Sequence, residues 1–129
     1  MASPAVIGPV LDDEILENLL ALDGNKGLFL DELIDIYTNA SPAALLALIN
    51  CLETGTPKEI SRLAHKVRGM VGNLGAIRLA AVLEFIEVSS ETLEPGDFAS
   101  LPDSLRYEQQ LFLAALRDHR HSATKKKLL

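Results

Sequence analysis

Residues 63–76, LAHKVRGMVGNLGA, combine a histidine with groups that favour the transfer of an anionic group. Three cations, Arg62, Lys66 and Arg68, lie within three residues of His65. Their charges disfavour a protonated imidazole by like-charge repulsion, and they suit an anion near the ring. A neutral, exposed imidazole flanked by cations is a nucleophile for a phosphoryl group, whose transfer depends on in-line access and charge stabilisation.

Two glycines, Gly69 and Gly72, interrupt the helical pattern of this segment. Each costs about 1 kcal/mol relative to alanine in a helix interior. Helical side chains lean toward the N-terminus, so the residue four positions after a histidine leans onto its imidazole. A glycine at position 69 therefore predicts an open notch beside His65. The residues alone leave a second interpretation open, in which the glycines end a helix and His65 is an ordinary solvated histidine.

The rest of the chain offers no other set of residues suited to catalysis. No base or nucleophile is identifiable beside His65, which counts against an enzyme that uses metal or acid–base chemistry. The sequence has no glycine-rich phosphate loop and no kinase motif, and no metal ligands are predicted. A helical docking module that binds a partner without being phosphorylated is the alternative.

The elements that position His65 are amphipathic helices, because no stretch alternates with the period of a strand. Ser41 with Pro42, and Thr56 with Pro57, predict two helix starts, each with a capping residue followed by proline in the first turn. Short connections between helices make neighbours antiparallel. We therefore expect an all-α fold, an antiparallel four-helix bundle with additional short helices. About six helices are expected, at residues 12–22, 26–39, 42–54, 57 to a turn at 73–75, 76–91 and 103–118.

Apolar stripes predict which faces are buried. On the helix at 26–39, the residues expected to point inward are Phe29, Leu33, Ile36 and Tyr37. On the helix that begins at residue 57, His65 lies off the apolar stripe, toward the polar side. The histidine is therefore expected to be exposed.

Length and charge limit the functions that are possible. The 129 residues predict one domain, residues 1–118, followed by a disordered basic tail, residues 119–129. The chain has a net charge of −6, and residues 54–82 form a basic island of five bases and one acid. This pattern argues against nucleic-acid binding and for a local anionic partner. No apolar run is long enough for membrane insertion, and no secretory signal is recognised, so we expect a cytoplasmic monomer.

The stretch AHKVRGMVGNLGA resembles the signature of histidine-containing phosphotransfer (HPt) domains. In that pattern an alanine precedes the histidine, and an apolar residue, a basic residue and a glycine follow it by two, three and four positions. A turn similar to Leu-Gly-Ala comes later. The matching residues are Ala64, His65, Val67, Arg68, Gly69, Asn73, Leu74, Gly75 and Ala76.

The resemblance implies a phosphorelay intermediate. His65 would accept a phosphoryl group from the aspartate of a receiver domain and pass it to another receiver domain. It also implies a four-helix bundle without a nucleotide site or cofactor, since the magnesium ion belongs to the receiver. The relay intermediate would be free-standing or the C-terminal domain of a hybrid sensor histidine kinase, and its expected partners are response-regulator receiver domains. In an alternative, the ATP-binding domain of a sensor histidine kinase phosphorylates the histidine directly.

Three departures from the HPt pattern stand out. Arg68 stands where lysine is commoner and presents a planar fork in place of a point charge. Met70 and Val71 stand where small residues are common; Val71 falls on the apolar stripe, whereas Met70 is a candidate partner contact. Lys66 adds a charge at a position that is usually neutral. The sites expected to stabilise the phosphoryl group or to bind the partner are Arg62, Lys66, Arg68, Gly69, Met70 and Gly72.

Overall fold

The structure is built from helices. The computed structural model describes the backbone of residues 8–128 and the side chains of residues 8–94 and 96–119. No strand occurs in these residues, apart from an isolated bridge between Leu11 and Ala76. The all-α fold predicted from the sequence is therefore confirmed. The helices are α1 (Asp13–Ala21), α2 (Leu28–Thr54), α3 (Pro57–Gly72), α4 (Ile77–Ser89), the 3-10 helix η1 (Pro95–Phe98) and α5 (Leu101–Leu128).

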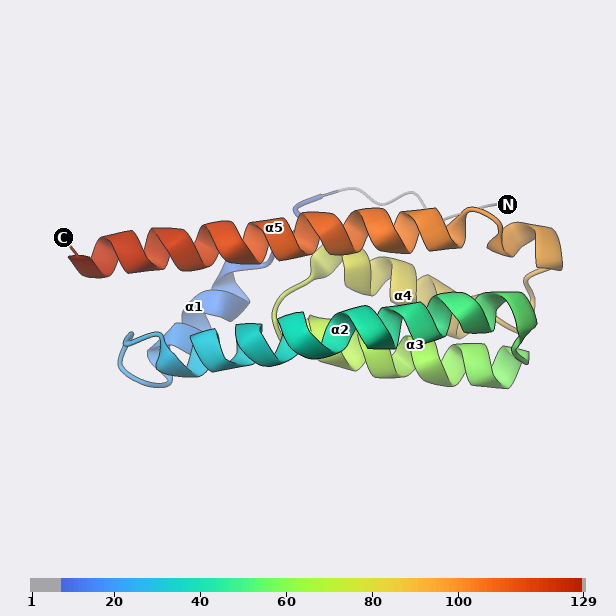
Figure 1. Ribbon diagram of the computed structural model, residues 1–129, viewed down its shortest axis with the longest axis horizontal. Helices are drawn as coiled ribbons and strands as arrows, with labels where there is room; N and C mark the ends of the chain where they lie inside the picture. Colours follow the sequence, from blue (N-terminus) through green and yellow to red (C-terminus); the bar gives the residue numbers. More distant parts are fainter. Residues whose placement is uncertain (1–7, 129) are drawn as a thin grey trace.

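Four helices form an antiparallel bundle. α2, α3, α4 and α5 lie side by side along the long axis of the molecule, and the short α1 packs near one end of α2 (Figure 1). The interior of the bundle is apolar and includes fully buried side chains from all four long helices. The largest of these are Leu30, Leu48, Val67, Val71, Leu79, Leu83, Ile86, Leu101, Leu105, Phe112 and Leu116.

Local signals fix the position of α3, which carries His65. The Thr56 side chain accepts a hydrogen bond from the backbone N–H of Glu59 at 3.2 Å, so it is the N-cap predicted from the sequence. At the other end, Gly75 has φ 77°, and a Cβ there would lie 2.9 Å from the backbone oxygen of Asp12. Only glycine fits this turn without strain, and the turn ends α3 and directs the chain into α4.

The predicted break between residues 39 and 42 is wrong. The two helices expected at 26–39 and 42–54 are one helix, α2, with Pro42 inside it. Ser41, expected to cap a new helix, is instead fully buried within α2. Packing against the other helices keeps the helix continuous, although proline removes one backbone hydrogen bond.

The buried face of α2 also differs from the prediction. Leu30, Ile34 and Tyr37 are buried, whereas Phe29 is 40% exposed and Ile36 is 56% exposed. Of the four residues expected to point inward, Tyr37 is therefore buried and Leu33 is partly buried against the core, whereas Phe29 and Ile36 are not in it. The error has the same origin as the false break, because the stripe that fits residues 26–39 alone is rotated from the stripe that fits the whole helix.

The last helix is longer than expected. α5 continues to Leu128, past residue 118, where the sequence placed its end. The division into a domain of residues 1–118 and a disordered tail of residues 119–129 stays a prediction. None of the helices within residues 8–128 has both the length and the apolar character that crossing a membrane requires.

Candidate functional site

His65 lies on the outer surface of α3. Its side chain is 69% exposed, while Ala64 and Val67, on the adjacent face of the same helix, are buried in the core. The predicted position of the histidine, off the apolar stripe, agrees with this arrangement. The imidazole is therefore accessible to another molecule.

One carboxylate, that of Glu87 on α4, fixes the orientation of the imidazole. Nδ1 of His65 lies 2.8 Å from Oε2 of Glu87. The Glu87 carboxyl has a lowered pKa, so it is ionised at neutral pH and can only accept a hydrogen bond. Nδ1 must then carry the hydrogen, and the lone pair of the neutral ring is on Nε2. The geometry therefore leaves Nε2 as the ring nitrogen with the free lone pair.

Arg68 binds the same carboxylate. Its Nε donates to Oε1 of Glu87 at 2.9 Å, and its Nη2 donates to Oε2 at 3.4 Å. Hydrogen bonding from Arg68 is the main cause of the lowered pKa of Glu87, and the same bond raises the pKa of Arg68. Nη2 is also 3.4 Å from Nδ1 of His65, but it cannot donate to a nitrogen that already carries a hydrogen. His65, Arg68 and Glu87 therefore form one charged cluster at the surface.

The other two predicted cations are not part of this cluster. Arg62 and Lys66 are exposed, and the structure shows neither of them bonded to His65 or Glu87. Arg62 is close enough to Cys51 on α2 to lower the pKa of its thiol, although burial has the larger, opposite effect. Among the described residues, the charged groups for which the structure shows contacts with His65 are the carboxylate of Glu87 and the guanidinium of Arg68.

The two glycines of α3 leave open space. A Cβ built on Gly69 or on Gly72 meets no atom within 4 Å. Gly69 is exposed and lies one helical turn after His65, in the position from which a side chain would lean onto the imidazole. The surface beside the ring is therefore bare, as the predicted notch requires.

Met70 lies between α2 and α3. It lines a hollow of about 190 Å³ together with Leu33, Ile36 and Asn73. Ile36, which was wrongly expected in the core, and the partly buried Leu33 thus form part of an apolar surface next to Met70. We call the side chains of Leu33, Ile36 and Met70 the apolar patch.

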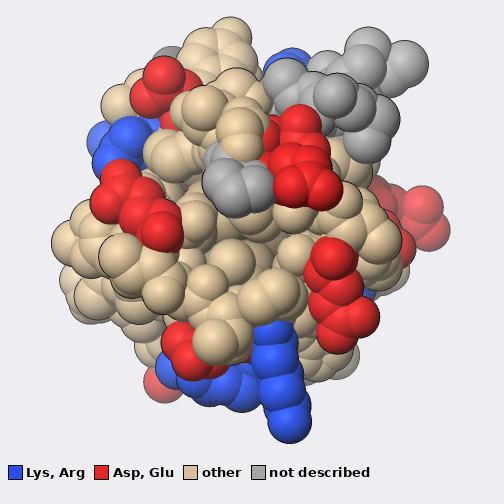
Figure 2. All heavy atoms as spheres, turned by 90° about the vertical axis from the view of Figure 1, so that its right-hand side faces the viewer, with Lys and Arg blue, Asp and Glu red and all other residues tan. Residues whose placement is uncertain are grey.

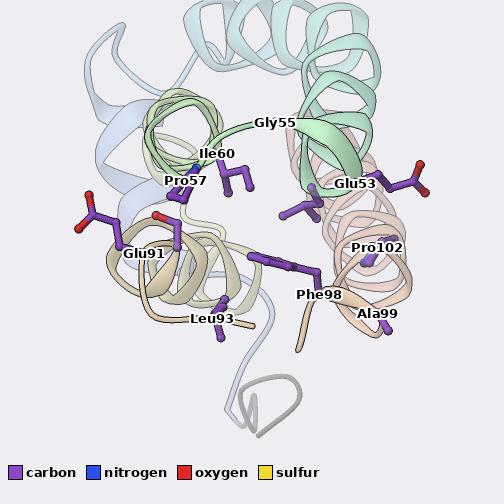
Figure 3. Close-up of a pocket in the computed structure, with 11 residues that line it drawn as sticks. Glu53, Gly55, Pro57, Ile60, Glu91, Leu93, Phe98, Ala99 and Pro102 are labelled. Atoms are coloured by element: carbon purple, nitrogen blue, oxygen red, sulfur yellow. The ribbon is translucent and has the colours of Figure 1, made fainter. Parts of the chain in front are cut away.

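A larger cavity of about 490 Å³ lies at the end of the bundle where α2 turns into α3. Figure 2 shows this end as a hollow of uncharged residues, with acidic residues around it and basic residues below it. In the close-up of Figure 3, Phe98 projects across the cavity toward Ile60, whereas Glu53 and Glu91 point outward. His65 does not line this cavity, which is therefore separate from the charged cluster.

Glu87 is the site residue that the sequence interpretation missed. The turn at residues 73–75 could have indicated Glu87. In two antiparallel helices joined by a turn, a residue that precedes the turn faces a residue that follows it by about the same number of positions. His65 precedes Gly75 by ten residues and Glu87 follows it by twelve. Counting outward from the turn would have brought the two side chains together.

The comparisons with known proteins agree with this arrangement. A family model described as Hpt domain matches residues 27–121, which include α2, α3, α4, η1 and most of α5. A search of curated proteins and a search of solved structures found no match. The family match covers more than half of the chain and contains His65 with all of its contacts. The chain therefore belongs to the Hpt domain family, whose members are phosphotransfer modules of two-component signalling and not nucleotide-binding enzymes.

Proposed function

We propose that His65 is the phosphoryl acceptor of this domain and that it relays the group between the receiver domains of response regulators. One observation carries the proposal. The exposed imidazole is bonded through Nδ1 to Glu87 at 2.8 Å, which leaves Nε2 free beside the bare surface of Gly69. Nucleophile and approach path are thus on the same side of α3.

The transfer step follows from this tautomer. Nε2 attacks the phosphorus of an aspartyl phosphate on the receiver. The Nε2–P bond forms while the bond between phosphorus and the aspartyl oxygen breaks, and the aspartate leaves as a carboxylate. The ring then holds a hydrogen on Nδ1 and the phosphoryl group on Nε2, so it carries a positive charge. Transfer to a second receiver reverses these bonds and restores the neutral imidazole.

Glu87 stabilises the charge that develops in this step. Its ionised carboxylate already contacts Nδ1, so the positive ring of the phosphorylated form faces a negative group and no proton has to leave. Arg68 balances the carboxylate and lies within one turn of the ring, from where it can face the phosphoryl oxygens. The cluster therefore supplies one charge of each sign, a carboxylate for the ring and a guanidinium for the phosphoryl group.

Partner binding is proposed to use the surface around the cluster. The apolar patch offers the exposed side chain of Ile36 beside the partly buried Leu33 and Met70, while Arg62 and Lys66 add positive charge to the exposed side of α3. Such a surface suits a receiver domain with apolar and acidic groups around its active site. We expect the Mg²⁺ ion of the reaction to belong to the receiver, and no cofactor of this chain enters the proposal.

The acceptor assignment is tested by labelling with phosphoramidate, a small phosphoryl donor that needs no partner protein, and with a panel of phosphorylated receivers. The wild-type chain is expected to take up one label that is acid-labile and base-stable, as a phosphorus–nitrogen bond requires. His65→Gln is expected to take up none while remaining helical by circular dichroism. The change removes only an exposed side chain, so the core is not disturbed.

His119 and His121 provide the matched control. The double variant His119→Gln/His121→Gln is expected to be labelled like the wild type. Label that persists in His65→Gln would overturn the assignment of the acceptor. A wild-type chain that takes label from phosphoramidate but from none of the receivers, and only from a kinase ATP-binding domain, would overturn the relay between receivers.

A further inference from the structure

Three residues on one face of α3 hold Glu87. Ser61, His65 and Arg68 follow each other at the i, i+4 and i+7 positions, which share a helix face. His65 and Arg68 bind the carboxylate of Glu87, whereas Ser61 donates its hydroxyl hydrogen to the backbone oxygen of Glu87 at 3.0 Å. Both the main chain and the side chain of this one residue of α4 are therefore bonded to α3.

The backbone oxygen of Glu87 needs such a donor. Because α4 ends at Ser89, Glu87 lies in its last turn, where carbonyl groups lack partners further along the helix. The N–H groups of Thr92 and Leu93 both bond to Ser89, and the hydroxyl of Ser90 reaches Glu87 only at 3.4 Å. Ser61 is the closer donor, and it is the one that links the end of α4 to α3.

We propose that Ser61 is a positioning residue for the phosphoryl acceptor. Its hydrogen bond fixes the last turn of α4 against α3, so that the Glu87 carboxylate reaches Nδ1 of His65. The inference rests on the proposed function, because it concerns the nitrogen that accepts the phosphoryl group. Without Ser61, the last turn of α4 is free to fray. Arg68, with two bonds, then retains the carboxylate, while His65 loses its single contact.

The substitution Ser61→Ala tests this role in the full chain. Two-bond proton–nitrogen NMR spectra of the ¹⁵N-labelled protein report which imidazole nitrogen carries the hydrogen, and His65→Gln identifies the signals of His65. In the wild type the hydrogen is expected on Nδ1. In Ser61→Ala a substantial share is expected to move to Nε2, and labelling by phosphoramidate is expected to slow by about fivefold, the effect of losing one ordinary hydrogen bond.

Two variants separate positioning from simple helix capping. Ser61→Thr keeps the hydroxyl and is expected to restore both the tautomer and the labelling rate. Ser90→Ala removes the other hydroxyl at the same carbonyl, but this hydroxyl belongs to α4 itself and does not join the two helices. It is expected to leave the tautomer of His65 unchanged.

The role of Ser61 and the acceptor role of His65 are contradicted by different results. A Ser61→Ala protein with the wild-type tautomer and labelling rate would overturn the role of Ser61, and so would failure of Ser61→Thr to restore them. If the wild-type chain takes no label at His65, the proposed function fails, but the NMR spectra still decide whether Ser61 controls the imidazole.

Discussion

At the scale of single residues, Glu87 connects the stability of the domain to its chemistry. Its pKa is lowered from 4.5, mainly by the hydrogen bond from Arg68, so folding favours the ionised form. A carboxyl with a lower pKa in the folded state contributes stability above its unfolded value, and this contribution is lost as the pH falls through the folded value. The cluster around His65 should therefore weaken in acid below about pH 4.5.

The substitution Glu87→Gln makes this dependence measurable. At pH 7 the variant is expected to have a lower free energy of unfolding than the wild type, because the charged acceptor for Arg68 is gone. The difference is expected to shrink as the pH falls below 4.5, where Glu87 becomes protonated in the wild type as well. Urea unfolding at several pH values measures it, with Glu91→Gln, an exposed carboxylate beyond the end of α4, as control. A difference that stays constant down to the acid limit would contradict the ionic role.

Gly69 distinguishes an open notch from a simple interruption of the helix. A side chain at this position meets no atom of the domain, so Gly69→Ala and Gly69→Leu are expected to fold and to gain up to about 1 kcal/mol of stability. If the notch admits the receiver, transfer from a receiver should slow progressively, by about tenfold or more for leucine, because reacting atoms are held apart. Thermal unfolding and transfer rates on the same preparations decide the question. A stable leucine variant that transfers at the wild-type rate would exclude a steric role.

At the scale of the elements, the α3–α4 pair was predictable and α2 was not. Thr56, Pro57 and the glycine turn at residues 73–75 are local signals whose meaning does not depend on the rest of the fold. Ser41 followed by Pro42 has two meanings, since the same pair starts a helix or lies inside a longer one. Ser41 and Leu45 are buried against the other helices, and this burial keeps the pair inside one long helix. The local sequence pattern contains no information about that packing. Glu87 was missed for a related reason, because its role depends on which helices pair.

The proline within α2 gives a prediction at this scale. Pro42 removes one hydrogen bond from the helix interior, so Pro42→Ala is expected to raise the free energy of unfolding, by up to about 3 kcal/mol. Pro57→Ala is the matched control, because Pro57 lies at the start of α3, where proline costs nothing, and a change near zero is expected. Urea unfolding followed by circular dichroism measures both. A less stable Pro42→Ala protein would contradict this prediction and show that the core depends on the proline side chain at this position.

At the scale of the whole molecule, the candidate surfaces lie along α3 or at one end of the bundle. The charged cluster on α3 and α4 and the apolar patch on α2 and α3 share α3, whereas the cavity near Phe98 lies at one end of the bundle (Figures 1 and 3). Under the proposed function, a receiver that brings its phosphorylated aspartate to His65 covers part of α3 and a neighbouring helix. The exposed apolar side chains of α2 suggest which neighbour it covers.

Two exposed residues of α2 test this choice. Ile36 is 56% exposed and lines the hollow with Met70, whereas Leu46 is 53% exposed and does not. Ile36→Ser is expected to raise the receiver concentration needed for half-maximal transfer by about tenfold, since burying an isoleucine contributes roughly 1.5–3 kcal/mol. Leu46→Ser should leave it unchanged, and both variants should take label from phosphoramidate at the wild-type rate, because that donor needs no docking surface. Equal losses in the two variants would show that the receiver does not bind over the apolar patch, and slower labelling by phosphoramidate would show that Ile36 acts on His65 itself.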